Sequence, residues 1–149
     1  MSSSADRAGT WTGENAFRLL ADDAPHPAPA TAVVQVSGAM TTVAYTWEHP
    51  DDGPQAGLLA LGPADGTPDA GPVVALWGDS WHQAPEARVL TGRVHEDGTV
   101  VVAYDYAEGR WRWEVALASD ADALALRMDN VPLADGERHT AMTATFTRA

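Results

Sequence analysis

The sequence predicts an all-β protein in which about ten antiparallel strands follow one another up and down around a closed barrel. Its apolar runs are short, rich in Val, Thr, Trp and Tyr, and bounded by Gly, Pro or Asp clusters, which is typical of strands joined by turns. Short turn sequences separate neighbouring runs, so consecutive strands should pair antiparallel. Closing the sheet removes its two exposed edges, and a barrel of this size holds one small ligand.

The N-terminal half of the chain contains five expected strands, each bounded by turn residues. Ser37-Gly38 makes a tight turn between two of them. Residues 22–30 are too rich in proline for a helix interior and are expected to form a longer connection. Residues 62–72 contain several Gly and Pro residues and are expected to form an open loop. The strands expected here cover residues 9–20, 31–37, 40–49, 56–62 and 72–78.

The C-terminal half continues the same pattern with shorter connections. Glu96-Asp97-Gly98, Ala107-Glu108-Gly109 and Ala134-Asp135-Gly136 each carry Gly where a hairpin loop needs a left-handed residue. The strands expected here cover residues 87–95, 99–106, 110–118, 123–130 and 138–148. We expect residues 1–8 to be a disordered N-terminus and residues 9–149 to form a single barrel domain.

Composition excludes several classes of function. The chain has 149 residues, 45% of them hydrophobic, and a formal net charge of −12, so nucleic acid and anionic membrane surfaces would be repelled. It has no Cys, and all nine basic residues are Arg, which excludes thiol catalysis, disulfides and lysine Schiff bases. Residues 1–7 lack the apolar core of a signal peptide. We expect a cytoplasmic bacterial protein.

The first expected strand carries Gly9-Thr10-Trp11, and a Gly-x-Trp at this place resembles the start of the lipocalin and fatty-acid-binding (calycin) barrels. The longer run Gly9-Thr10-Trp11-Thr12-Gly13 is similar to the start of the nitrobindin-like haem-binding barrels. Leu126-Arg127-Met128 and the segment from Ala144 to Arg148 are similar to the last two strands of that family. These resemblances imply a lipocalin-like, ten-stranded barrel with an internal ligand cavity.

The nitrobindin-like resemblance also implies haem, but the site does not match directly. The iron-ligating His of that family falls at Ala141 in this sequence. His139 lies two residues earlier and is expected on the same strand face, so haem would require His139 as a shifted ligand. No other metal is expected, because the chain lacks metal-binding motifs. The five histidines are scattered: His26, His49, His82, His95 and His139.

The densest cluster of chemically useful residues runs from Trp77 to His82. If the strand continues that far, its period of two places Trp77, Asp79 and Trp81 on one face. Ser80 and His82 would share the other face. Two indoles beside a carboxylate form a ligand platform. In the alternative interpretation, the tryptophans close the end of the barrel and Asp79 begins a turn.

The expected third strand carries Tyr45, Trp47 and His49 on one face. If this face points inward, the two aromatic residues line the cavity and His49 is a candidate proton donor or acceptor, because its ordinary pKa lies near neutrality. If it points outward, the three residues form an aromatic ladder across neighbouring strands. We expect the inward orientation.

Two further stripes and one arginine complete the candidate ligand-binding residues. The stripes are Tyr104 with Tyr106 and Trp111 with Trp113, and the tryptophans are expected to face the interior. Arg127 is a candidate because fatty-acid-binding barrels hold ligand carboxylates with buried arginine. Periodicity nevertheless predicts that Arg127 lies outside, and inside it would need a carboxylate such as Asp79 or Asp129.

Two functional hypotheses follow, and a third is weaker. The first is a protein without a cofactor, monomer or homodimer, that binds a small hydrophobic molecule among its Trp and Tyr side chains. The second is a cofactor-free isomerase or cyclase in which Asp79, His49 or His82 acts as acid or base. The third is haem binding through His139.

Overall fold

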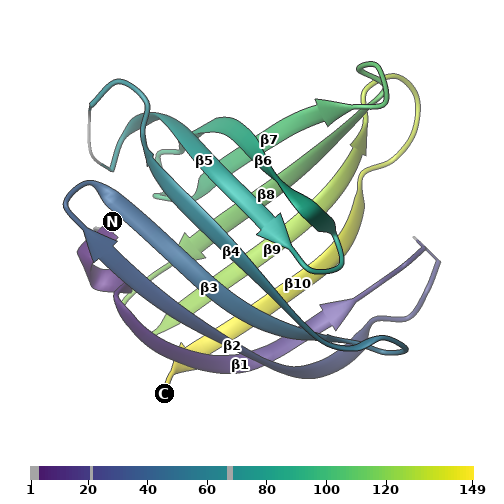
Figure 1. Ribbon diagram of the computed structural model, residues 1–149, viewed down its shortest axis with the longest axis horizontal. Coiled ribbons are helices and arrows are strands. Elements are labelled where there is room, and N and C mark those ends of the chain that lie inside the picture. The colour runs from purple at the N-terminus through teal and green to yellow at the C-terminus, as the bar shows by residue number, and fades with distance from the viewer. Residues whose placement is uncertain (1–3, 21, 67–68) are drawn as a thin grey trace.

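A computed structural model of the protein describes residues 4–20, 22–66 and 69–149. It confirms the predicted fold: ten strands form one closed barrel in which every strand pairs antiparallel with the next and β1 pairs with β10 (Figure 1). A short 3₁₀-helix, η1 (Ser4–Arg7), precedes the barrel. The strands are β1 (Gly9–Phe17), β2 (His26–Ser37), β3 (Met40–His49), β4 (Gly53–Pro63), β5 (Gly71–Asp79), β6 (Gln83–Val94), β7 (Val100–Tyr106), β8 (Trp111–Ser119), β9 (Ala123–Pro132) and β10 (His139–Arg148).

Alternating burial along the strands separates the interior of the barrel from its outer surface. In β3, Val43, Tyr45 and Trp47 are buried, whereas the residues between them are more exposed. Val, Leu, Met and Phe side chains from the other strands complete the core, for example Leu59, Leu90 and Leu126. The period-two pattern of the sequence therefore produces a barrel filled with apolar side chains over much of its length.

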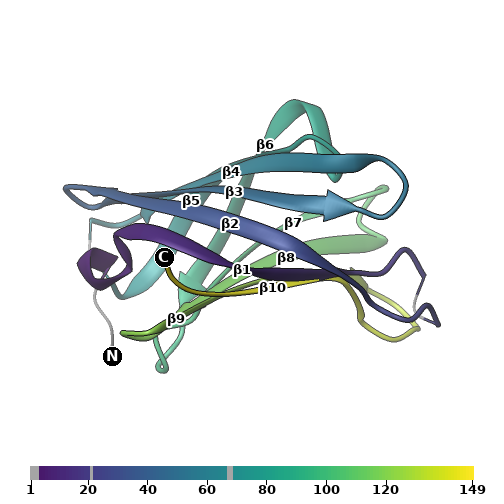
Figure 2. The same cartoon turned by 90° about the horizontal axis from the view of Figure 1, so that it is seen from below.

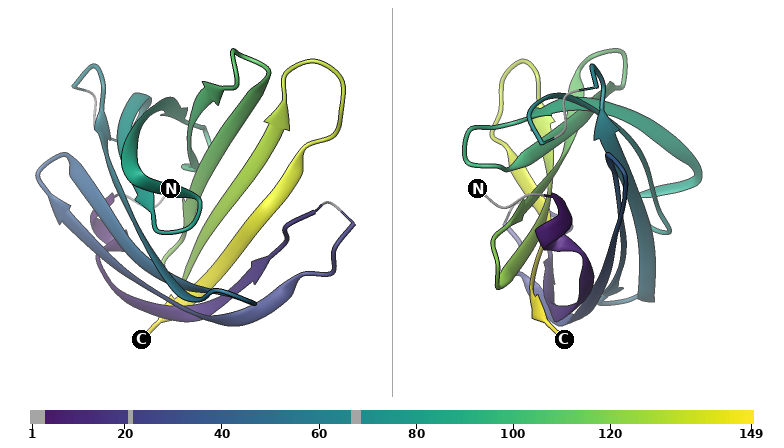
Figure 3. Two further views of the ribbon diagram at one scale, coloured as in Figure 1. Left: turned by 45° about the vertical axis from the view of Figure 1, so that its right-hand side comes forward. Right: turned by 90° about the vertical axis from the view of Figure 1, so that its left-hand side faces the viewer.

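The two ends of the barrel differ, and we name them by what they carry. At the helix end, η1 lies beside the start of β1 and the end of β10 (Figures 2 and 3). Arg7 is buried there and donates to the Ser119 hydroxyl at 2.6 Å, and the Arg148 guanidinium lies 4.3 Å from the Trp11 ring. The site end is the opposite one, where β1, β3, β5, β7 and β9 finish.

The N-terminus is more ordered than the sequence predicts, because residues 4–7 form η1. Residues 1–3 lie outside the described residues. Trp11 explains this order: its indole Nε1 donates to the Arg7 backbone carbonyl at 2.9 Å, and the Arg7 side chain is almost fully enclosed. The segment thus covers the helix end of the barrel.

Strand β2 begins earlier than expected, because residues 26–30 belong to it and not to a connection. These residues pair with β1 only, since the ladder with β3 begins at Thr31 opposite Thr46. Pro27 and Pro29 are therefore tolerated where β2 has one neighbour, because a missing N–H costs no ladder hydrogen bond on that side. On β3, the backbone N–H of Glu48 donates instead to Asn15 Oδ1 of β1 at 3.2 Å.

Strand β6 is joined to its two neighbours unequally. Asp79 pairs with Gln83 and Trp77 with Arg88, so residues 84–87 of β6 arch away opposite the single residue Gly78. The ladder between β6 and β7 holds only residues 91–94 against residues 100–103. The start of β6 and the end of β7 consequently lie apart at the site end (Figure 1). We call this place the β6–β7 opening.

Within the described ranges, no helix has the length and apolarity needed to span a membrane.

Candidate functional site

Asp79 is the centre of a buried polar network at the site end. Its Oδ2 accepts hydrogen bonds from the Tyr45 hydroxyl at 2.7 Å and from Trp47 Nε1 at 3.0 Å. The Tyr45 hydroxyl in turn accepts one from Trp77 Nε1 at 2.9 Å. The other carboxylate oxygen, Oδ1, accepts the backbone N–H groups of Trp81 and His82, both at 2.9 Å. Strands β3 and β5 therefore meet around one carboxylate that is 3% exposed.

This network stabilises the charged form of Asp79. Burial by itself raises the pKa of Asp79, but contacts with His82 and the Tyr45 hydroxyl outweigh burial and hold that pKa below its ordinary value of 3.8. Burial and the charge of Asp79 raise the pKa of Tyr45 well above 10, so the Tyr45 hydroxyl stays protonated and remains a donor. The site end thus holds a buried carboxylate anion.

His82 enters the interior of the barrel from the turn that follows β5. The prediction that His82 shares a face with Ser80 required the strand to continue past Asp79, but β5 ends at Asp79, which begins a turn as in the alternative interpretation. The turn carries the His82 side chain inward, where it is 3% exposed and its Nδ1 lies 3.4 Å from Asp79 Oδ1. Ser80 points outward, and its hydroxyl lies 3.0 Å from the Ala56 backbone N–H, which donates to it.

Aromatic rings surround the His82 imidazole. Ring centroids lie 4.8 Å away for Trp47, 5.0 Å for Trp81 and 5.3 Å for Trp113. Phe17 packs against the same group, 5.5 Å from Trp47. Trp113 also stacks on Trp77 at 5.9 Å with an interplanar angle of 16°. Side chains from β1, β3, β5, β8 and the β5–β6 turn thus form one aromatic cluster.

Several buried ring nitrogens of this cluster lack the hydrogen bonds that buried polar atoms normally make. Neither Nδ1 nor Nε2 of His82 makes a hydrogen bond among the residues the structure describes, although Nδ1 lies 3.4 Å from Asp79 Oδ1. The same holds, within that part of the chain, for Trp113 Nε1 and, outside this cluster, for His139 Nε2. Apolar packing alone does not account for these polar atoms.

His49 is buried as the inward orientation of its strand predicts, but its ring serves the local turn. Nδ1 accepts the backbone N–H groups of Asp51 and Asp52, both at 3.0 Å. The ring stacks on Trp81 at 4.8 Å. Because this nitrogen lone pair is already committed, His82 is better placed than His49 to exchange a proton with a ligand.

Tyr104 and Tyr106 stand at the β6–β7 opening, half-buried and facing the interior. The Tyr104 hydroxyl donates to Gln83 Oε1 at 2.9 Å, and the Tyr106 hydroxyl donates to Asn130 Oδ1 at 2.6 Å. The guanidinium carbon of Arg88 lies 5.3 Å from the centre of the Tyr104 ring. This side of the site end is consequently more polar than the Phe17 side.

Two candidate residues lie away from the interior. Arg127 is on the outer face of β9, with its side chain 52% exposed and its Nε 3.2 Å from Asp129 Oδ2, so it does not line the barrel. This corrects its inclusion among cavity residues and agrees with its strand periodicity. Trp111 lies at the very start of β8 and is 38% exposed, so it borders the end of the barrel and not its interior.

His139 occupies the start of β10 opposite the inward-facing Asn130. The register of β10 shifts between Thr140 and Met142, so Ala141 is an extra residue in the ladder and the simple alternation from Ala141 to His139 is broken. Across the described ranges, no group of three or more His, Asp or Glu side chains could hold a metal ion.

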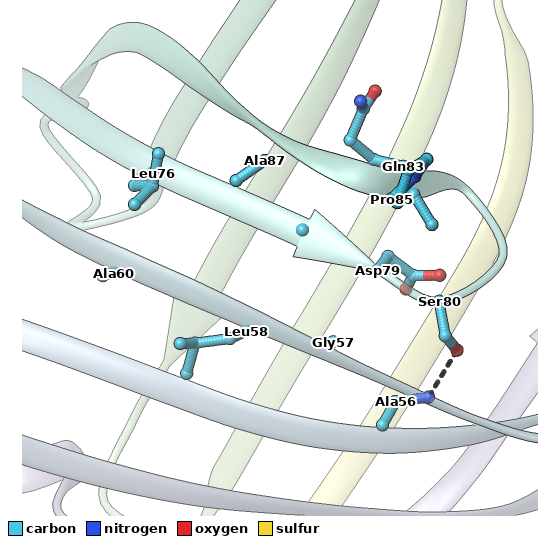
Figure 4. Close-up of a pocket in the computed structure, with 12 residues that line it drawn as sticks. Ala56, Gly57, Leu58, Ala60, Leu76, Asp79, Ser80, Gln83, Pro85 and Ala87 are labelled. Atoms are coloured by element: carbon cyan, nitrogen blue, oxygen red, sulfur yellow. Dashed lines mark hydrogen bonds between the residues drawn. The ribbon is translucent and has the colours of Figure 1, made fainter.

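A hollow of about 500 Å³ lies on the outer surface, between β4, β5 and the arch of β6 (Figure 4). Leu58 and Leu76 contribute about half-exposed side chains to it. Its polar groups are already paired: Ser80 Oγ lies 2.6 Å from Gln55 Oε1 and accepts the Ala56 backbone N–H (Figure 4). In contrast to the interior, this outer pocket presents polar groups that are satisfied.

Sequence reasoning missed several residues of the site. Phe17 could have been found, because it continues the face of Trp11 and Asn15 along β1. Gln83, Arg88 and Asn130 carry no such signal, because their roles depend on the arch of β6 and on which strands meet at the opening.

Comparisons with known proteins identify the fold but no family. No family model matches the sequence, and no curated protein matches it. Among solved structures, the S-type phycobiliprotein lyase CPES from Guillardia theta is similar, with a TM-score of 0.59 and 13% identity, over 98% of this chain and 90% of that chain. The ywiB protein from Bacillus subtilis aligns with a TM-score of 0.36 and 14% identity, over 94% and 90%. The chain thus has a lipocalin/calycin-like barrel fold.

Proposed function

We propose that this protein binds a small, largely apolar molecule at the site end of its barrel. The observation that carries the proposal is the set of enclosed ring nitrogens on His82, Trp113 and His139, for which the described residues supply no partner. Burying such atoms unpaired costs about 1–3 kcal/mol each, so a bound molecule with matching polar atoms would stabilise them. The surrounding indole and phenyl rings supply the apolar contact area.

Titration with N-phenyl-1-naphthylamine, a planar probe that fluoresces in apolar sites, tests this proposal. Trp113→Leu and Tyr104→Leu remove rings from the interior, and each should weaken binding by about fivefold to tenfold. Leu58→Ala and Leu76→Ala in the outer pocket serve as matched controls and should change the affinity less than about twofold. If the two outer-pocket variants weakened binding and the two interior variants did not, the binding site would be the outer pocket. Absence of binding to the wild-type protein would reject the proposal.

Haem is a second candidate, favoured by the enclosed and unpartnered Nε2 of His139 among the described residues. Bound through this nitrogen, haem would supply an iron centre for binding or redox chemistry of small molecules. Adding haem to the purified protein should then produce a Soret band that His139→Ala abolishes. A spectrum that stays equal to that of free haem would exclude this function.

A further inference from the structure

The structure places the Asp79 carboxylate and the His82 imidazole as an ordered pair. Backbone N–H groups and two side-chain donors hold the carboxylate, and among the described residues His82 is the one basic side chain within ion-pair distance of it. Nδ1 is the nitrogen that faces the carboxylate, at 3.4 Å. A carboxylate beside Nδ1 favours a proton on that nitrogen, which leaves the lone pair on Nε2.

Nε2 of His82 is therefore an enclosed acceptor, and Trp113 Nε1 is an enclosed donor. Neither has a partner in the part of the chain that the structure describes, and their rings are neighbours with centroids 5.3 Å apart. A hydroxyl group offers both functions that these nitrogens lack, because it can donate its proton to Nε2 and accept from the Trp113 N–H. An ether or a hydrocarbon could not, since neither supplies a proton for Nε2.

We propose that the site end binds a planar apolar molecule with an acidic hydroxyl group, a phenol or an enol, and that His82 takes up its proton. This inference rests on the proposed binding function and specifies its ligand. The hydroxyl O–H bond breaks, the proton forms an N–H bond at Nε2, and the electron pair stays on oxygen. The resulting oxyanion accepts from Trp113 Nε1, while Asp79 stabilises the imidazolium.

The surroundings of His82 support this assignment over simple packing. The charged carboxylate lies on one side of the imidazole, and the rings of Trp47, Trp81 and Trp113 lie around it. Exclusion of water by these rings strengthens the interaction between the carboxylate and an imidazolium. His49 lacks this arrangement, because its Nδ1 accepts two backbone N–H groups.

A nitrophenol is a suitable probe, because it titrates near neutrality and its absorbance reports ionisation directly. At a pH where free 4-nitrophenol is mostly protonated, binding should raise its phenolate fraction, equivalent to an increase of about tenfold in its ionisation constant. 4-Nitroanisole, which has no acidic proton, should bind more weakly and show no such change.

Two substitutions of His82 keep the test independent of folding. His82→Gln retains a polar side chain and His82→Phe retains a ring, and both should abolish the phenolate signal while N-phenyl-1-naphthylamine still binds. His95→Gln, at an exposed position beyond β6 at the helix end, is the matched control and should leave the signal unchanged.

The possible outcomes separate the two proposals. Binding of 4-nitrophenol without ionisation, or a phenolate signal that persists in both His82 variants, would overturn the proton transfer while leaving apolar binding in place. Failure of both 4-nitrophenol and N-phenyl-1-naphthylamine to bind would instead reject the binding function itself.

Discussion

Asp79 determines the electrostatics of the site end at the scale of single residues. A buried carboxylate is costly unless hydrogen bonds compensate its lost hydration, and here Tyr45, Trp47 and the backbone of the following turn provide them. The same hydrogen bonds hold the turn that carries His82 into the barrel. One side chain therefore joins local structure to the proposed chemistry.

The lowered pKa of Asp79 predicts how stability changes with pH. Because the folded-state pKa lies below the unfolded value, Asp79 contributes stability at pH values above about 4, and this contribution disappears as the pH falls through the folded-state pKa. Asp79→Asn should lose about 1–3 kcal/mol at pH 7, because its single amide oxygen can accept from Tyr45 and Trp47 or from the backbone N–H groups of the turn, but not from both pairs. Urea unfolding followed by tryptophan fluorescence at pH 7 and pH 3 measures both effects.

Comparing the stability of the wild-type protein with that of Asp79→Asn separates the contribution of Asp79 from those of other acidic residues. Asp97 and Asp105 also have lowered pKa values, owing first to hydrogen bonds from Thr99 and Arg112 respectively, but both are unchanged in the variant. The stability difference between wild type and Asp79→Asn should therefore shrink on acidification. A difference that is equal at both pH values would contradict the assigned role.

At the scale of secondary structure elements, closure of the barrel depends on how closely β1 approaches β10. Gly13 pairs with Phe146, and a Cβ atom at Gly13 would lie 1.8 Å from the Thr145 carbonyl oxygen and 2.8 Å from the Phe146 Cα. These are backbone atoms, which cannot move aside as the end of a flexible side chain can. The two strands that close the sheet would have to separate.

Gly13→Ala should consequently destabilise the protein by roughly 3 kcal/mol or more. Gly78→Ala is the matched control in β5, because its Cβ would meet neighbouring atoms only at 3.9 Å, an ordinary contact distance. The control should change the free energy of unfolding by less than about 1 kcal/mol. Thermal or urea denaturation decides, and equal stability of the two variants would show that β1 and β10 can adjust.

At the scale of the whole molecule, Arg148 connects separate parts of the barrel at its helix end. Its guanidinium donates to the carbonyls of Ala121 at 3.1 Å and Ala8 at 3.0 Å, and to that of Asp6. It also lies over the ring of Trp11. One side chain at the end of the last strand thus holds η1, the first strand and the β8–β9 turn together.

Arg148→Lys should destabilise the fold by about 1–3 kcal/mol although the charge is kept. A single ammonium group cannot reproduce the planar set of donors or stack over an indole in the same way. Arg93→Lys, at an exposed position on β6, is the control and should stay within about 0.5 kcal/mol of wild type. Equal stability of the two variants in chemical denaturation would contradict the role of Arg148.

Local patterns in the sequence determined most of the fold. Alternating burial and turn chemistry act over a few residues, so they predicted all ten strands, the antiparallel order and the inward position of Tyr45 and Trp47. The same periodicity predicted that Arg127 points outward, where it is found. Resemblance at Gly9-Thr10-Trp11 pointed to the lipocalin/calycin-like barrel.

Only the tertiary structure decided how the site end is assembled. His82 turns inward because Asp79, held by residues of β3, fixes the turn after β5, and no local pattern contains that contact. The prolines of β2 are accepted because of where the ladder with β3 begins, and the orientation of His139 follows from a register shift in β10. These features depend on contacts between segments distant in sequence, whereas strand periodicity depends on neighbours along the chain.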